Sequence, residues 1–264
     1  ASGRVLFADH EGRASYPASV TKLMTFLLVL EDVQKGVYKL TDRATASRYA
    51  TTMEPSSVGI KPGESMTIED LLYSIMVKSA NDAAVLLAEH STAKNAGREI
   101  QPGDLQAFVL RMNKKAESLG MTHTHYETPN GYPPRPGSKR PFDTSTARDL
   151  VKLAKAVLRY PEVFRYTKTK LTTVTDGNGN PLKMVNHNNI LVKDKQKILN
   201  EKGESEVDGL KTGYIDAGGS SIILTGKRNG KRAIVIVLGS QTSKLRDASA
   251  RQLMVEALDA IAGK

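Results

Sequence analysis

The chain of 264 residues contains no cysteine and no tryptophan, so its aromatic packing can draw only on five phenylalanines and nine tyrosines. The absence of cysteine excludes disulfide bonds, thiolate metal ligands and a cysteine nucleophile. The longest apolar runs, Phe26–Leu30 and Ala233–Leu238, fall far short of the roughly 18 residues that a membrane span requires. We therefore expect a folded domain with an aliphatic core and no membrane span.

Motifs for nucleotides, metals and nucleic acids are missing as well. The sequence holds no G-x-x-x-x-G-K-[ST] or G-x-G-x-x-G loop, and its five histidines show no H-E-x-x-H or comparable metal spacing. Lysine and arginine number 38 against 28 acidic residues, a net charge of +10, but the basic residues form no run of five and no reader motif accompanies them. We expect no cofactor, no metal and no nucleic-acid partner.

Strand patterns lie near both ends of the chain and helical patterns lie between them. This order predicts an α+β fold, in which an antiparallel sheet formed by the N- and C-terminal segments is flanked by helices and a mostly helical subdomain is inserted. The expected single domain, 1–264, divides into a sheet subdomain of about 1–43 and 167–264 and a helical subdomain of about 44–166. Hydrophobic residues (39%) and charged residues (25%) occur at ordinary globular levels.

Periodicity and turn signals predict the individual elements. A short strand is expected at Arg4–Asp9. The helix from Ser19 to about Gly36 is apolar almost all round its axis, so it should be buried. Further helices are expected at Thr67–Lys78, Asn81–Ser91, Gly103–Leu119, Thr144–Arg159 and Ser243–Ala262, and hairpins at Lys170–Thr175 with Pro181–Val185 and at Gly219–Gly226 with Lys231–Gly239.

The first candidate for chemistry is Ser19-Val20-Thr21-Lys22, at the start of the buried helix. Residues at i and i+3 lie on one helix face, so the lysine amine can reach the serine hydroxyl. A lysine at the start of such a helix should be partly desolvated, which lowers its pKa. A second S-x-x-K, Ser91–Lys94, lies in a polar stretch, where an ordinary surface role is the better interpretation.

Two other short motifs carry polar groups suited to a peptide substrate. Ser79-Ala80-Asn81 places a hydroxyl and a carboxamide at a turn between two helices, where either could also serve only as a cap. Lys211-Thr212-Gly213 precedes a β-branched strand and offers a cation, a hydroxyl and a bare backbone. An extended peptide could pair along such an edge without meeting a side chain.

The order S-x-x-K, S-x-N, K-T-G resembles that of the serine penicillin-binding proteins, and most closely the low-molecular-mass D-alanyl-D-alanine carboxypeptidases of bacterial cell-wall metabolism. The resemblance implies the β-lactamase/transpeptidase-like fold. It covers nearly the whole chain and extends to Tyr16-Pro17-Ala18, Asn81-Asp82-Ala83-Ala84, Asn130-Gly131, Ser145–Leu150 and Asp208–Gly213.

The resemblance also implies roles. Ser19 would attack the carbonyl of the penultimate D-alanine of a peptidoglycan stem peptide, Lys22 would act as a neutral base, and Ser79 would relay the proton to the departing amine. Water would then release the acyl group, whereas a β-lactam would form the same adduct and leave slowly. The substrate would be held by Asn81, Lys211, Thr212, Gly213, Tyr214 and Arg246, with the N–H groups of Ser19 and Tyr214 forming the oxyanion hole.

The sequence departs from the larger family members in three respects. It stops at Lys264, so we expect a catalytic domain without the C-terminal β-rich domain and amphipathic anchor, either as a trimmed chain or as a single-domain member that resembles the soluble endopeptidase branch. The expected N-terminal strand is short, and the loop Tyr132–Pro141 is longer and more basic than usual. The chain begins at Ala1 without a signal peptide, and the family implies action outside the cytoplasm, at the periplasm or wall face. The basic loop Tyr132–Pro141, if it lies near the site, could influence which wall strands are accepted.

Three alternatives remain open at this stage. A β-lactamase would need a deacylating base, but the E-x-x-L-N pattern of class A enzymes is absent and Glu127-Thr128-Pro129-Asn130 lacks its leucine. An endopeptidase that cleaves cross-links would use the same motifs. A non-catalytic wall-binding module would use the positive charge alone.

Overall fold

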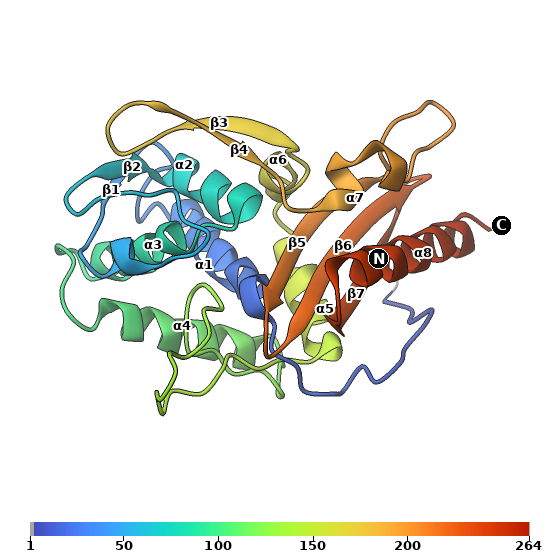
Figure 1. The fold of residues 1–264 in the computed structure, drawn as a ribbon, viewed down its shortest axis with the longest axis horizontal. Coiled ribbons are helices and arrows are strands. Elements are labelled where there is room, and N and C mark those ends of the chain that lie inside the picture. The colour runs from blue at the N-terminus through green and yellow to red at the C-terminus, as the bar shows by residue number, and fades with distance from the viewer. Residues whose placement is uncertain (1–2, 264) are drawn as a thin grey trace.

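The computed structural model describes residues 3–263 and shows two regions side by side (Figure 1). One is a three-stranded antiparallel sheet with a long helix across one face, and the other is mostly helical. No helix among the described residues is long and apolar enough to cross a membrane. The α+β class predicted from the sequence is confirmed.

The sheet is built from β5 (Val207–Ile215), β6 (Gly219–Arg228) and β7 (Lys231–Ser240), in the order β5-β6-β7. Asn229 and Gly230 alone join β6 to β7, and both have positive φ, as the two-residue turns of twisted hairpins require. β5 pairs only with β6, which makes it an edge strand. The strand that carries the K-T-G motif therefore has a free edge.

Helix α8 (Ser243–Ala262) covers one face of the sheet and has the predicted bounds. Thr242 caps its start by accepting the N–H of Leu245, and Gly263 at φ 86 ends it. Its buried residues pack with the apolar residues of β6 and β7 and with the short helix α7 (Asn189–Val192) in a second core cluster.

Helix α1 (Lys22–Gln34), preceded by one 3₁₀ turn (Ala18–Thr21), lies in the main core. Every residue from Lys22 to Leu30 is buried, which confirms the prediction of a buried helix. The 3₁₀ turn moves the α-helical N-cap from Ser19 to Thr21. Because the surrounding helices cover all faces of α1, the residues at its N-terminus are positioned on a rigid support.

The helical region surrounds α1. Its helices are α2 (Ile68–Tyr73), continued by a π-helical turn (Ser74–Lys78), α3 (Asn81–Asn95), α4 (Asp104–Ser118), α5 (Ala147–Val157) and α6 (Val163–Thr167), with a 3₁₀ turn at Ala50–Thr52. A further 3₁₀ turn, Asp194–Gln196, follows α7 beside the main sheet. Two small antiparallel pairs are attached, β1 (Arg43–Thr45) with β2 (Ser65–Thr67) and β3 (Leu171–Thr175) with β4 (Pro181–Val185). These elements confirm the predicted helices and both hairpins to within a few residues.

The predicted strand at Arg4–Asp9 is wrong. This segment is not a strand, Val5, Leu6 and Phe7 are exposed, and the main sheet consists of C-terminal strands alone. The N-terminal segment contacts the rest of the fold further along the chain, where the N–H of Arg148 donates to the Glu11 oxygen at 2.9 Å and Ser15 forms an antiparallel bridge with Ser145. The residue types at these positions suit a strand, but a strand also needs a partner edge, and composition does not reveal one.

Candidate active site

The amine of Lys22 is at the centre of the site. Lys22 is the first residue of α1, and its Nζ lies 2.9 Å from Ser19 Oγ, 2.7 Å from Asn81 Oδ1 and 2.8 Å from the backbone oxygen of Asn130. The side chain is completely buried. Two of these three neighbours are carbonyl oxygens and can only accept. A neutral amine would donate its two N–H groups to them and keep its lone pair for the Ser19 hydroxyl.

Burial is the main cause that lowers the pKa of Lys22 well below its ordinary value, and the positive charge of Lys211 lowers it further. Asp143 and Asp82 act in the opposite direction but do not compensate. The lysine is therefore suited to accept a proton from Ser19 near neutral pH.

Ser79 and Lys211 form the second part of the site. Ser79 ends the π-helical turn in the left-handed region, at φ 62 and ψ 29, an uncommon backbone conformation for a residue other than glycine. Lys211 Nζ donates to Ser79 Oγ at 2.9 Å and to the Thr212 oxygen at 2.8 Å. Burial, followed by the charge of Arg246, lowers the pKa of Lys211 to about 7. Neither of its partners is a carboxylate.

The strand β5 lies directly against the turn that carries Ser19. A Cβ placed on Gly213 would be 2.7 Å from the Pro17 oxygen and 3.1 Å from the Ser19 nitrogen, so only glycine allows this approach. Thr212 is buried, whereas Tyr214 is 59% exposed and its hydroxyl donates to Asp216 Oδ1 at 2.7 Å. The backbone of the K-T-G motif is thus held next to Ser19.

Arg246 lies near Lys211 but is already paired. It is buried in the first turns of α8, and its guanidinium contacts Asp247 at 2.6 Å. Asn189 holds the other oxygen of the same carboxylate at 2.7 Å. Arg246 nevertheless contributes positive potential at Lys211, as the lowered pKa of that lysine indicates. The structure therefore brings all nine sequence-predicted residues to one place, with direct side-chain contacts for Ser19, Lys22, Asn81, Ser79 and Lys211.

Two residues of the site had no role assigned from the sequence. Asn130 accepts from Lys22 through its backbone oxygen and donates from Nδ2 to the Asn81 oxygen at 3.4 Å. Asp143 is buried and accepts from Thr21 Oγ1 at 2.8 Å and from the N–H of Glu127 at 2.8 Å. Burial raises the pKa of Asp143 to about 6. The pair Asn130-Gly131 was visible as a motif, but nothing near Asp143 marked it in advance.

Gly131 presses the Asn130 segment against the start of the first helix. It has φ 74, and a Cβ there would lie only 1.9 Å from the Ala18 oxygen. We expect Gly131→Ala to lower the free energy of unfolding by about 2 kcal/mol more than Gly137→Ala, through overpacking. Gly137 has φ 78 in the same loop, and no atom lies within 4 Å of a Cβ placed there. Gly137→Ala therefore measures the strain of a positive φ without any overpacking. Denaturant titration of both variants measures the difference; equal losses would contradict the close approach.

The two buried lysines predict a bell-shaped pH profile for acylation. Lys22 must lose its proton to act as a base, so kcat/KM should rise with pH through its lowered pKa. Lys211 loses its charge near pH 7, so kcat/KM for an anionic ligand should fall above that pH. Lys211→Arg keeps a permanent charge and should remove the alkaline limb only. The measurement is the rate of penicillin acylation from pH 4 to 10; a rate that climbs without a break to pH 10 would contradict a neutral Lys22.

Comparison with known proteins agrees with this geometry. The family model of peptidase S11, D-alanyl-D-alanine carboxypeptidase, matches residues 1–242. D-alanyl-D-alanine carboxypeptidase DacF of Bacillus subtilis is 31% identical over 253 residues, which are 96% of this chain and 58% of that protein. The chain thus spans less than two thirds of the length of this relative.

Solved structures give the same result. Penicillin-binding protein D2 from Listeria monocytogenes, in its ampicillin-bound form, is 29% identical with a TM-score of 0.74, and the match covers 99% of this chain and 93% of that one. Penicillin-binding protein 6B from Escherichia coli is 31% identical with a TM-score of 0.77, over 96% and 73% of the two chains. With its motifs gathered in one site and its length matched by the family model, the chain belongs to the peptidase S11 family of D-alanyl-D-alanine carboxypeptidases.

Proposed function

We propose that this protein is a serine DD-peptidase that removes the terminal D-alanine from peptidoglycan stem peptides through an acyl-enzyme and is acylated by β-lactams in the same way. The observation that carries the proposal is the buried Lys22 amine, hydrogen-bonded at once to Ser19, Asn81 and the Asn130 carbonyl. Lysine in that setting can be a base at neutral pH, which an exposed lysine cannot.

The first step is attack by Ser19 Oγ on the carbonyl carbon of the penultimate D-alanine, while its proton passes to Lys22 Nζ at 2.9 Å. The negative charge that develops on the carbonyl oxygen is stabilised by the N–H groups of Ser19 and Tyr214. Gly213, which lies against the backbone of Ser19, brings these two segments close enough for that role. Removing one such donor typically costs about 10²–10³ in rate.

The second step breaks the carbon–nitrogen bond. Ser79 relays the proton to the nitrogen of the departing D-alanine, so the proton taken from Ser19 leaves with the product and Lys22 is neutral again for the deacylating water. Lys211 donates to Ser79 Oγ at 2.9 Å, and this hydrogen bond favours the transient loss of the Ser79 hydroxyl proton. Thr212, Lys211 and Arg246 supply the hydroxyl and the positive potential for the terminal carboxylate of the substrate, and Asn81 orients both Lys22 and a substrate carbonyl.

The position of the acidic side chains favours a peptidase over a β-lactamase. Glu127, the nearest match to a class A deacylating base, is engaged with His125 at 2.9 Å. Asp143 is buried and occupied by Thr21 and backbone N–H groups. Among the described residues no carboxylate is hydrogen-bonded to Ser19 or Lys22, so we expect slow hydrolysis of the β-lactam adduct.

Digestion of purified muropeptides tests the assignment. Free D-alanine with intact cross-links would support the carboxypeptidase, and cleaved cross-links without free D-alanine would identify an endopeptidase instead. Rapid turnover of penicillin without a persistent adduct would favour the β-lactamase. We further propose that the protein acts outside the cytoplasmic membrane, since its substrate is located there.

A further inference from the structure

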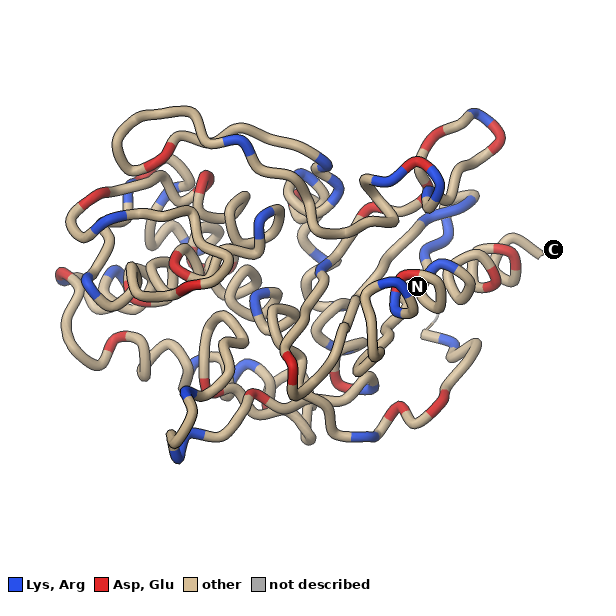
Figure 2. The backbone as a smooth tube through the Cα atoms, viewed as in Figure 1, with Lys and Arg blue, Asp and Glu red and all other residues tan. Residues whose placement is uncertain are grey.

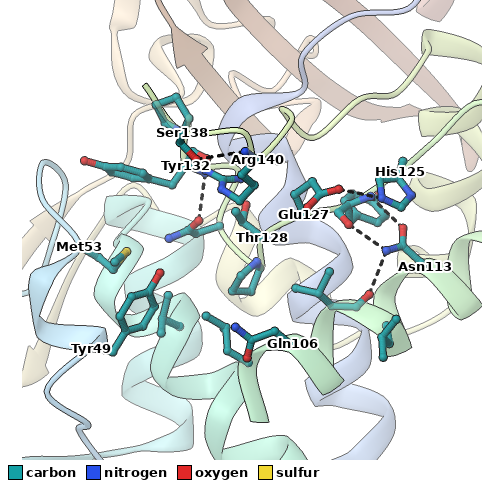
Figure 3. Close-up of a pocket in the computed structure, with 18 of the residues that line it drawn as sticks. Tyr49, Met53, Gln106, Asn113, His125, Glu127, Thr128, Tyr132, Ser138 and Arg140 are labelled. Atoms are coloured by element: carbon teal, nitrogen blue, oxygen red, sulfur yellow. Dashed lines mark hydrogen bonds and ion pairs between the residues drawn. The ribbon is translucent and has the colours of Figure 1, made fainter. Parts of the chain in front are cut away.

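A cavity borders the segment around Asn130, whose backbone oxygen accepts from Lys22. Figure 3 shows residues that line it. Its volume is about 690 Å³, within the ~300–1,000 Å³ that is typical of small-molecule sites. Helices α3 and α4 and the residues around Tyr49 form one side, and the segment from His125 to Arg140 forms the other. None of the nine residues assigned to the catalytic site lines it.

The cavity combines an apolar surface with polar groups that have no partner. Leu110 and Tyr49 both line it and are 63% and 51% exposed, a high exposure for large apolar side chains. Within residues 3–263, nothing is hydrogen-bonded to the Tyr49 hydroxyl, the Gln106 amide or the Arg135 guanidinium, which also line it. Apolar surface with a few free polar groups is the usual composition of a ligand site.

The cavity is lined by one carboxylate, that of Glu127, which is bonded to His125 at 2.9 Å, and by basic residues of the loop that follows it. Between Glu127 and Asp143 the chain has three basic residues and no acidic one. Figure 2 shows these basic positions gathered at the protruding tip of the loop. Two of them, Arg135 and Arg140, line the cavity, but Arg140 already donates to the Tyr132 oxygen at 2.9 Å. Arg135 is therefore the cation left for an anionic group.

Asn130 connects this cavity to the catalytic site. It lines the cavity, while its backbone oxygen accepts from Lys22. Tyr132, which follows two residues later, also lines the cavity, and its N–H is bonded to Asn130 Oδ1 at 3.0 Å. A ligand in the cavity would thus be separated from the acylation site by one segment of chain.

We propose that this cavity binds an acidic N-acetylated amino sugar of the wall glycan, so that the enzyme holds the glycan while the stem peptide enters the catalytic site. The proposal rests on the proposed function, which places the protein on peptidoglycan. The apolar face of a sugar ring would stack on Tyr49. Gln106 would bond the acetamido group, and Arg135 would pair with a carboxylate such as that of a peptide-free muramic acid.

The test is a calorimetric titration with the peptide-free disaccharide of N-acetylglucosamine and N-acetylmuramic acid, on protein first acylated by penicillin. The disaccharide should bind equally well before and after acylation. Gln106→Trp, which fills the cavity, and Arg135→Glu, which reverses its free charge, should each weaken binding about tenfold or more, the effect of losing one charge-assisted contact or its equivalent. The N-acetylglucosamine dimer, which has no carboxylate, should bind more weakly and independently of Arg135.

Matched controls lie on the same elements. Lys114 is on the same helix as Gln106 and Lys139 is in the same loop as Arg135, but neither lines the cavity. Lys114→Trp and Lys139→Glu should bind the disaccharide like the unchanged protein. Absent binding, binding lost on acylation, or equal weakening by the control variants would overturn the proposal, as would a poly(glycerol phosphate) that binds as well as the sugar. If penicillin fails to acylate the protein, the proposed function fails. Titration of the untreated protein then still tests whether the cavity binds the disaccharide.

Discussion

Replacing Ser19 by alanine should abolish covalent labelling by a fluorescent penicillin, with a loss of rate on the order of 10⁶, as for other serine nucleophiles. The expected effect is this large because, in the proposed mechanism, the Ser19 hydroxyl supplies the atom that forms the acyl bond, and within residues 3–263 no other hydroxyl is hydrogen-bonded to Lys22. The fold should remain, since the lost side chain is one oxygen at the edge of the site. Gel fluorescence and thermal unfolding measure the two quantities on the same sample.

The second S-x-x-K provides the matched control for this prediction. The surface role expected for this motif is wrong for Ser91, which is completely buried inside α3, where its hydroxyl donates to Asp32 and accepts from Arg111 at 2.8 Å. We therefore expect Ser91→Ala to lose about 1–2 kcal/mol of stability through its hydrogen bonds and to keep its labelling. Labelling that survives in Ser19→Ala, or that disappears in folded Ser91→Ala, would show that the nucleophile is assigned to the wrong serine.

Replacing Lys22 should produce the second-largest loss. Lys22→Arg introduces a group that cannot be deprotonated in a protein, and Lys22→Met introduces one that cannot accept a proton at all. Both should lower the acylation rate by about 10²–10⁴, the usual contribution of a general base. Stopped-flow acylation measures the rate, and circular dichroism checks that each variant is folded.

Lys94 is the corresponding control, because it lies one turn beyond Ser91, and its partly exposed amine is ion-paired with Glu99 at 3.7 Å. Lys94→Arg and Lys94→Met should acylate at the unchanged rate. An arginine at position 22 that acylates as fast as lysine would mean that positive charge, and not a neutral amine, is what the reaction uses there.

Most of the fold could be predicted from local sequence patterns. Three local patterns predict their elements to within a few residues, and the structure confirms them. They are the apolar residues of α1, the Asn229-Gly230 turn and the helical spacing of the apolar residues in α8. The failure at residues 4–9 has a different cause. Val5, Leu6 and Phe7 satisfy a strand's composition, but pairing depends on a partner edge that composition alone does not reveal.

The candidate site could be predicted to the extent that its groups belong to short motifs. Ser19 with Lys22, Ser79 with Asn81, and Lys211 with Gly213 are each neighbours in sequence, so spacing alone suggested them. Asn130 contributes a backbone carbonyl, and any residue type carries one. Asp143 lies 122 residues after Thr21, from whose hydroxyl it accepts a hydrogen bond, and it also accepts from the Glu127 N–H. A local sequence pattern cannot predict a contact between residues so far apart in the chain.

The environment of Lys211 has one further consequence. Its amine is buried against a hydroxyl and a carbonyl, with no anion in contact among the described residues, and burial together with the charge of Arg246 lowers its pKa to about 7. An incoming carboxylate would supply the missing counter-ion and favour the charged form. Binding of an anionic ligand would then be accompanied by uptake of a proton from the medium. Affinity for anionic ligands thus becomes coupled to the acidity of the surroundings, and it is greatest where protons are plentiful.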